Sequence, residues 1–175
     1  MRYFLVDKTV FDNNKVGMYG KLIYAILCKF LNADGTCFPS RKTISKCGNF
    51  SISTYNKYVS VMLLENVLEK KIRVRKNGSQ TSNLFKLKKN KENSFPVRSD
   101  IFSKGLSSTA VCVYICLARH VAEDNCCRVS QHLIAEKCSI SISSVIRAVK
   151  ELKSANMLET IKQTNINNNG NYVLL

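Results

Sequence analysis

Apolar residues recur at the spacing of an α-helix in three parts of the first half of the chain. Residues 17–31 carry apolar side chains at helical intervals and predict the first helix. Serine is a good helix N-cap, so we predict a short helix over residues 40–47 and a third helix over residues 51–65. The apolar stripe of the third helix is Tyr55, Val59 and Met62.

Extended segments flank these helices. Residues 3–11 are predicted as a short extended leader, and residues 67–75 and 83–88 as two strands. The tip between the strands, residues 76–82, contains Asn77-Gly78, which favours a tight turn. The order helix, short helix, turn, helix, strand, hairpin, strand is that of a winged helix-turn-helix.

The chain repeats itself at a spacing of 90 residues. Between residues 24–69 and 114–159, 13 of the 46 aligned positions are identical, and the alignment has no gap. The identical pairs include Tyr24 with Tyr114, Cys37 with Cys127, and Glu69 with Glu159. So many identities in register with a matching apolar pattern indicate an internal duplication.

The second copy repeats the predicted elements in the same order. Its leader contains Ile101-Phe102, which matches Val10-Phe11 of the first copy at a spacing of 91. Its helices are predicted near residues 107–121, 130–137 and 141–155, and its strands near 156–164 and 170–175. The last strand aligns at an offset of 87, so the second wing is three residues shorter than the first.

This pattern predicts a mainly α fold with small β-hairpins, of the α+β class, built from two tandem winged helix-turn-helix domains. The first domain is predicted over residues 1–89 and the second over 97–175. A polar, charged run followed by Pro96 marks residues 90–96 as the linker.

Net charge suggests the kind of partner. The chain has 175 residues and a formal net charge of +15, with a sequence pI near 9.6. This surplus predicts a polyanionic partner. Residues 1–90 hold 17 basic and 5 acidic residues (net +12), whereas residues 91–175 hold 10 and 7 (net +3). We therefore expect the first copy to be the main DNA anchor and the second to read an adjacent half-site weakly or to pack on the first.

Other functional classes find little support in the sequence. No catalytic motif or glycine-rich phosphate loop is recognisable, so we expect no enzyme and no cofactor. The eight cysteines include no Cys-x-x-Cys pair, so we expect no metal site. No apolar run reaches the roughly 20 residues of a membrane span, and no signal peptide is seen, so we expect a cytoplasmic, nucleoid-associated protein.

The third helix of each copy carries the predicted base-reading residues. In a helix-turn-helix this helix enters the major groove, where Asn can pair with adenine, Lys or Arg with guanine, and Ser or Thr with bases or phosphates. Ser51 and Ser141 are expected above all to cap these helices. The predicted DNA-binding residues are Ser51, Ser53, Thr54, Asn56, Lys57 and Ser60 in the first copy, and Ser143, Ser144, Arg147 and Lys150 in the second.

The first wing is strongly basic. Alternation along its first strand predicts that Lys71, Arg73 and Arg75 share one face, away from Ile72 and Val74. With the tip residues Lys76, Asn77, Ser79 and Gln80, these side chains are predicted to contact the DNA backbone or minor groove. The second wing, residues 162–169, is nearly neutral.

The first copy also resembles a known family. Its Cys37-Phe38-Pro39-Ser40, Thr43-Ile44, Ser51-Ile52-Ser53-Thr54 and Gly78-Ser79-Gln80-Thr81-Ser82-Asn83 segments are similar to a helix-turn-helix family of bacterial, phage and plasmid proteins. That family includes N-terminal domains of plasmid replication initiators. The resemblance covers most of residues 1–89 and is weaker over 97–175, where Val129 and Ser144 replace the proline and threonine and the wing motif is lost.

Three functions are compatible with these features. The leading hypothesis is a sequence-specific regulator of transcription that binds double-stranded DNA as a pseudo-dimer on two half-sites. The first alternative is a plasmid or phage replication initiator that binds origin repeats. The second, from another class, is a winged-helix protein-interaction module. A second copy of the chain and other regulatory or replication proteins remain candidate partners.

Overall fold

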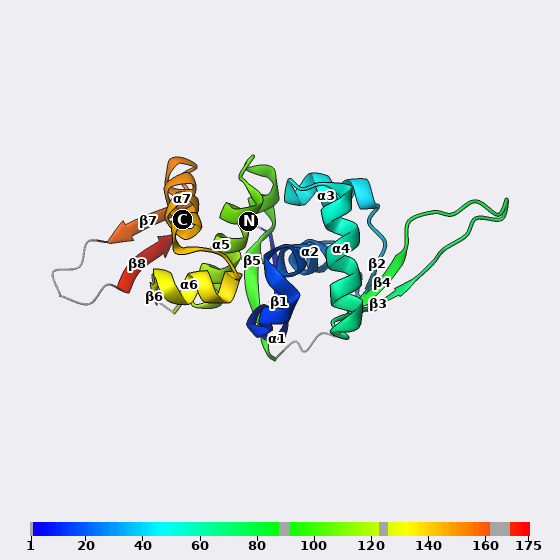
Figure 1. Ribbon diagram of the computed structural model, residues 1–175, viewed down its shortest axis with the longest axis horizontal. Coiled ribbons are helices and arrows are strands. Elements are labelled where there is room, and N and C mark those ends of the chain that lie inside the picture. The colour runs from blue at the N-terminus through cyan, green and yellow to red at the C-terminus, as the bar shows by residue number, and fades with distance from the viewer. Residues whose placement is uncertain (1, 88–91, 123–125, 162–168) are drawn as a thin grey trace.

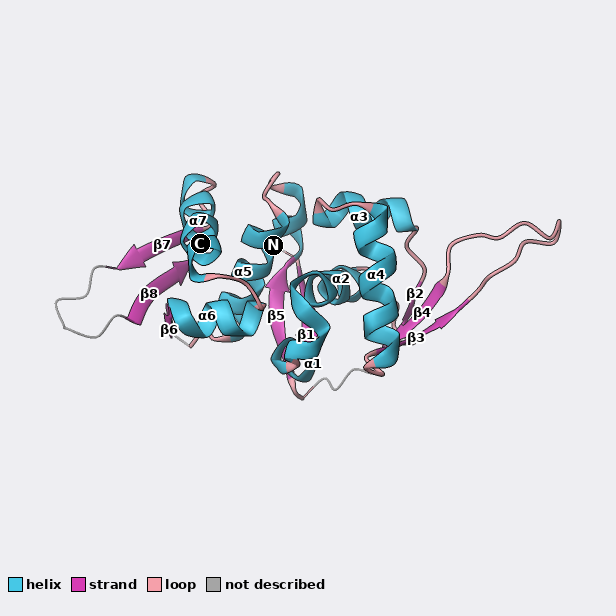
Figure 2. Ribbon diagram, in the orientation of Figure 1, coloured by secondary structure: helices cyan, strands magenta, loops and turns pink. Residues whose placement is uncertain are grey.

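The computed structural model describes residues 2–87, 92–122, 126–161 and 169–175 and has mixed α and β structure (Figures 1 and 2). The first half contains β1 (Tyr3–Asp7), α1 (Lys8–Asp12), η1 (Asn14–Val16), α2 (Gly17–Lys29), β2 (Thr36–Cys37), α3 (Arg41–Gly48), α4 (Ile52–Leu64), β3 (Leu68–Lys71) and β4 (Leu84–Leu87). The second half contains β5 (Ser94–Arg98), η2 (Ser99–Ser103), α5 (Ser108–Arg119), β6 (Cys126–Ser130), α6 (Gln131–Cys138), α7 (Ile142–Ser154), β7 (Leu158–Ile161) and β8 (Asn169–Leu174).

The elements of the two halves follow the same order, and each half carries a three-stranded antiparallel sheet. The strand orders are β2-β4-β3 and β6-β8-β7. The predicted helices and the two long strands of each half are present, with ends shifted by a few residues. The strands β2 and β6 were not predicted, because β2 has only two residues and the alternation of apolar and polar residues in β6 extends only from Cys127 to Ser130.

Serine caps set the starts of the helix-turn-helix helices. The Oγ of Ser51 accepts a hydrogen bond from the Thr54 backbone N–H at 3.1 Å. The equivalent Ser141 accepts one from Ser144 at 3.2 Å. These contacts confirm the predicted capping roles, since a cap satisfies a backbone N–H that has no partner within the helix.

The leader is only partly extended, which corrects the prediction for residues 3–11. Strand β1 ends at Asp7, whose carboxylate accepts a 2.8 Å hydrogen bond from the Thr9 backbone N–H and so caps α1. The short helix then turns Val10 and Phe11 into the core. Asp is a favourable N-cap, and this start signal within the leader was not used in the sequence-based prediction.

Strands β1 and β5 pair with each other and join the two halves of the chain. They are antiparallel, with Leu5 opposite Pro96 at the centre of the register. Residues 94–96, predicted to belong to a linker, therefore lie in β5, and residues 90 and 91 of that linker lie outside the described residues. The domain limits of 1–89 and 97–175 stay predictions.

The two halves also share one apolar core. Helices α2 and α5 pack against each other in the middle of the molecule, while the two three-stranded sheets lie at its two ends (Figure 1). Ile23 and Leu27 of α2 and Val113 and Leu117 of α5 are fully buried and belong to one continuous cluster. Burial on this scale favours a fixed arrangement of the halves.

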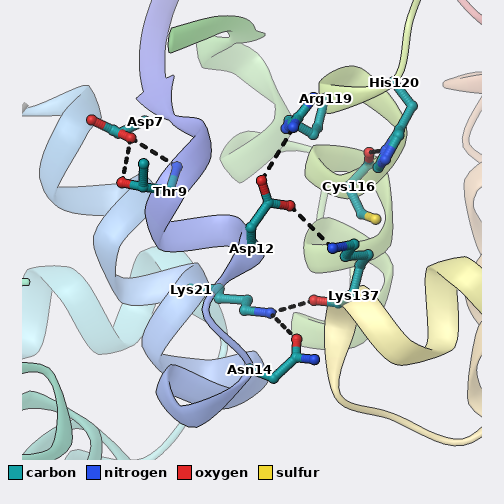
Figure 3. Close-up of polar contacts among 9 residues, drawn as sticks. All are labelled: Asp7, Thr9, Asp12, Asn14, Lys21, Cys116, Arg119, His120 and Lys137. Atoms are coloured by element: carbon teal, nitrogen blue, oxygen red, sulfur yellow. Dashed lines mark hydrogen bonds and ion pairs between the residues drawn. The ribbon is translucent and has the colours of Figure 1, made fainter. Parts of the chain in front are cut away.

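Polar contacts cross the same interface (Figure 3). The Asp12 carboxylate lies 3.2 Å from the Arg119 guanidinium and 3.4 Å from the Lys137 ammonium. The fully buried ammonium of Lys21 donates to the Asn14 side chain at 3.3 Å and to the Lys137 backbone carbonyl. A cation at this position also complements the negative C-terminal end of α6.

The pKa of Asp12 makes part of this interface sensitive to pH. Burial by itself would raise that pKa, but Arg119 and Lys137 outweigh the burial and lower it. A lowered folded-state pKa contributes stability that is present above the unfolded pKa and is lost as the pH falls through the folded value. We therefore expect the wild type to lose more stability than Asp12→Asn between about pH 6 and about pH 3.

Because 38% of the Asp12 side chain is exposed, this extra loss should be about 1 kcal/mol or less. Urea denaturation of both proteins at the two pH values measures it. Equal losses in the wild type and in Asp12→Asn would contradict the prediction.

Within the described residues, no helix is long and apolar enough to cross a membrane. The same residues contain no cluster of three or more His, Cys, Asp or Glu side chains placed to hold a metal ion.

Candidate nucleic-acid interface

Helix α4 presents the predicted base-reading residues to solvent. Its inner stripe of Tyr55, Val59 and Met62 is buried, as predicted, and rests on the core. Tyr58 packs on α2, with its ring centroid 5.4 Å from that of Tyr19. The side chains of the opposite face are exposed: Ser53, Asn56, Lys57 and Ser60.

The hydroxyl groups on α4 are already engaged within the helix. The Ser51 Oγ lies 2.7 Å from the Ser53 Oγ and 2.9 Å from the Thr54 Oγ1. The Ser60 hydroxyl donates to the Asn56 backbone carbonyl at 3.1 Å. Asn56 and Lys57 are therefore better placed to hydrogen-bond a base than the serines, which suit phosphate or water contacts.

A groove of about 870 Å³ runs between α4, the start of α3 and the wing that β3 and β4 carry. It brings together elements that are up to 44 residues apart in the chain, from Pro39 to Asn83. Its lining combines neutral polar groups with four cationic side chains, which are Arg41, Lys42, Lys70 and Arg75. Among the described ion pairs, none involves one of these four cations.

Tyr55 marks the floor of this groove. Burial raises the pKa of its phenol, whereas a hydrogen bond with Asn83 and the charge of Arg41 oppose that shift. Tyr55 thus contacts the wing through its hydrogen bond with Asn83 and interacts electrostatically with Arg41 at the start of α3. The helix, the wing and α3 therefore form one continuous polar surface.

Sequence reasoning missed Arg41 and Lys42 as members of this surface, and it counted Lys70 only as part of the basic run of the first wing. Arg41 and Lys42 follow the N-cap Ser40, whose Oγ accepts a 3.0 Å hydrogen bond from Thr43. A signal was available, because two adjacent cations at a predicted helix start point outward on its first turn. The prediction assigned DNA contacts only to the third helix and the wing.

The two strands of the first wing do not pair continuously. Strand β3 ends where Lys71 pairs with Leu84, and the next bridge joins Val74 to Gln80. Between these pairs the first strand has three steps, from Lys71 to Val74, and the second has four, from Gln80 to Leu84. This one-residue slip is typical of a β-bulge, which bends the hairpin and re-aims its side chains.

The shared face of Lys71, Arg73 and Arg75 stays a prediction, but the surroundings of the three cations differ. Arg75 lines the groove together with Ile72, whereas Lys71 does not line it. The Arg73 guanidinium instead stacks on the Phe38 ring, 4.7 Å from its centroid. This cation–π contact ties the base of the wing to the loop before α3.

The tip of the wing forms the predicted tight turn. The Gly78 backbone N–H donates to the Arg75 carbonyl at 2.9 Å, and Gly78 has a φ of 80°, which glycine adopts without strain. The Asn77 side chain accepts hydrogen bonds from the Ser79 backbone N–H and hydroxyl at 3.1 and 2.7 Å. Lys76 and Gln80 are exposed beside the turn.

Ile72 and Val74, which were predicted to lie on the opposite face of the strand from the basic side chains, are 68% and 61% exposed. The wing extends away from the body of the protein (Figure 1), so neither side chain reaches the core. Exposed apolar side chains beside cations can contact thymine methyl groups or sugars, which are the apolar parts of DNA.

The hollow beside α7 in the second half is smaller than the groove of the first half, and the acidic residue Glu151 lines it. On α7, Ser143, Arg147 and Lys150 are exposed, whereas Ser144 is half-buried. The Arg147 guanidinium donates to the Ser144 Oγ at 3.3 Å. Beside them lies a hollow of about 280 Å³, whose lining includes Glu151. The Glu151 carboxylate accepts hydrogen bonds from the backbone N–H and the hydroxyl of Ser107.

The predicted second wing spans residues 162–169, of which 162–168 lie outside the described residues. Its flanking strands β7 and β8 pair as predicted, with Thr160 opposite Tyr172.

One comparison with known proteins places a helix-turn-helix in the second half. Residues 104–158 match a family model described as a helix-turn-helix domain. The match covers α5, β6, α6 and α7. Such domains bind double-stranded DNA through the second helix of the motif, so the match supports DNA binding. Among curated proteins, none matches the chain.

The family match lies in the half that keeps fewer of the sequence motifs. The segments that resemble the bacterial, phage and plasmid family lie in residues 37–83, which is outside the match. The two halves nevertheless share their order of elements and their serine caps.

Proposed function

We propose that this chain binds specific sequences in double-stranded DNA through two winged helix-turn-helix units that arose by duplication, and that it regulates transcription. The groove between α4, α3 and the first wing is the single observation that carries this proposal. Four cationic side chains line this groove, beside the exposed face of α4, whose Asn56 and Lys57 are residue types that pair with bases. The chain acts as a binding protein without a catalytic step, at the nucleoid in the cytoplasm.

In this proposal α4 lies in the major groove and the first wing follows the backbone. Asn56 and Lys57 contact base edges, while Arg75, Lys70 and the cations of α3 contact phosphates. Phosphate contacts set position and affinity, whereas base contacts set sequence preference. The first unit is the main anchor, because residues 1–90 carry a net charge of +12 and residues 91–175 carry +3.

Two single substitutions test this division of roles. Lys57→Ala should relax the preference at one base position, with a loss of about 1–3 kcal/mol on the preferred sequence. Arg75→Ala should weaken binding to all sequences evenly and reduce the slope of log affinity against log salt by about one. Fluorescence anisotropy on a preferred and a scrambled duplex across a salt series measures both effects.

The scrambled duplex is the control for sequence preference. If both substitutions weaken binding to both duplexes by the same factor, the assigned roles are wrong. Binding that is absent or insensitive to salt would refute the DNA-binding proposal and favour a protein-interaction module. Footprints on iterated origin repeats, rather than on a promoter, would favour a replication initiator.

A further inference from the structure

The pairing of β1 with β5 has the symmetry of a dimer. The leaders of the two copies align at a spacing of 91, as Val10-Phe11 and Ile101-Phe102 show. Leu5 and Pro96 are therefore equivalent positions, and they lie opposite each other at the centre of the antiparallel register. Antiparallel strands that pair about their own equivalent residue are related by a two-fold rotation.

Other contacts between the halves obey the same rotation. Helix α2 packs on its counterpart α5. The segment after β1, helix α1, contacts α6, and the segment after β5, helix η2, contacts α3. In Figure 1 the sheets that carry the two wings lie at opposite ends of the long axis. An interface in which each side uses the same surface is isologous, as in two-fold homodimers.

Specific contacts hold this arrangement in place. The Ser108 hydroxyl at the start of α5 contacts the Gly48 and Asn49 carbonyls at 2.7 and 2.9 Å, in the turn before α4. On the other side, Asp12 pairs with Arg119 and Lys137 (Figure 3). The turn that positions the first recognition helix is thus fastened to the second half. The spacing and direction of α4 and α7 are set by the fold and not by a loose tether.

We propose that a single chain recognises an inverted repeat with two unequal half-sites, in one defined orientation. This proposal rests on the proposed function and adds the symmetry of the DNA site and its stoichiometry. Two recognition helices that are related by a two-fold rotation read the two DNA strands in opposite directions. The matching DNA site is therefore a (pseudo)palindrome. The isologous surface is already buried between the two halves of one chain, so it is not available to a second chain. One chain therefore occupies one site.

The half-sites are unequal because the two recognition faces differ. Lys57 and Arg147 occupy the same repeat position, and both residue types pair with guanine. At the neighbouring position Asn56, which suits adenine, is replaced by Ile146, which is 39% exposed and suits a thymine methyl group. The bound site should thus have a guanine at related places in both halves and different bases beside it.

The first experiment selects bound duplexes from a random library with the full chain. The expected result is an inverted motif whose halves differ. Three synthetic duplexes then carry the selected half-sites: the first as an inverted repeat, the second as a direct repeat. The third is an inverted repeat with about 5 extra base pairs between the half-sites, which is half a helical turn. Anisotropy should show about 10-fold or greater loss for the last two, down to the affinity of the first half-site alone. Light scattering should give one chain per duplex.

Substitutions identify which half each helix reads. Lys57→Ala should relax the guanine of one half-site, and Arg147→Ala should relax the guanine of the other. Lys153→Ala is the matched control, because it removes an exposed charge from the last turn of α7, away from the N-terminal residues that reach base edges, and should leave both preferences intact.

Distinct outcomes separate the failures. Equal affinity for inverted and direct order, two chains on each duplex, or selection of a single half-site would each overturn the inverted-repeat proposal while leaving DNA binding intact. No salt-dependent binding to any duplex would overturn the proposed function and this inference together.

Discussion

Replacing Lys42, Lys70 and Arg75 together with alanine is expected to weaken binding to duplex DNA about 100-fold at about 0.15 M salt. All three side chains are exposed and line the groove of the first half. Each phosphate contact contributes about 0.9 to the slope of log affinity against log salt. Loss of three contacts should therefore lower that slope by about three and the affinity by about two powers of ten.

The measurement is anisotropy on one selected duplex between about 0.05 and about 0.3 M salt. The matched control replaces Arg2, Lys15 and Lys104, which are exposed and lie outside the groove, so both variants lose three charges, one of them an arginine. The control should lose far less affinity, because its charges act only at long range through screened solvent. Equal losses in the two triple variants would show that net charge, and not this groove, provides the binding.

Removing one aromatic ring from either sheet is expected to destabilise the whole chain. Phe85 in β4 and Tyr172 in β8 are the buried centres of the two sheets, opposite Cys37 and Cys127. Phe85→Ala should lower the free energy of unfolding by about 3–5 kcal/mol, since truncation leaves a cavity. Tyr172→Ala should have an effect of the same order. Because α2 and α5 share one core, each substitution should lower the stability of both halves.

Urea denaturation followed by circular dichroism gives the loss of stability, and hydrogen exchange read by mass spectrometry reports each half separately. We expect a single transition in the wild type and in both variants. Phe85→Leu is the control, because it keeps most of the apolar volume and should cost about 1.5 kcal/mol or less. If Phe85→Ala leaves exchange in residues 126–161 unchanged, the two halves are independent domains.

The local structure of both halves could be read from the sequence because short-range signals determine it. The serine caps Ser51 and Ser141, the stripe of Tyr55, Val59 and Met62, and the turn at Asn77-Gly78 depend on neighbours within a few residues. Exposure of Asn56 and Lys57 followed from the same stripe, since the period of a helix determines which residues face away from the core.

The composition of the candidate site was predicted less well. Arg41, Lys42 and Lys70 join the groove through packing of α3 and the wing against α4. The break in the pairing of the wing was not predicted: the chain has three steps from Lys71 to Val74 but four from Gln80 to Leu84. A slip depends on both strands at once, so neither strand alone reveals it.

The sequence by itself predicted a repeated unit and most of the helices and hairpins of each half, and it determined which half carries the charge. Only the tertiary structure decided how the copies are related. Pairing of β1 with β5, packing of α2 on α5, and the contacts of Asp12 join residues about 90 to 125 positions apart. A repeat spacing of 90 residues in the sequence is compatible with halves related by a translation and with halves related by a rotation. The two-fold arises from long-range burial and strand pairing, which no local pattern encodes.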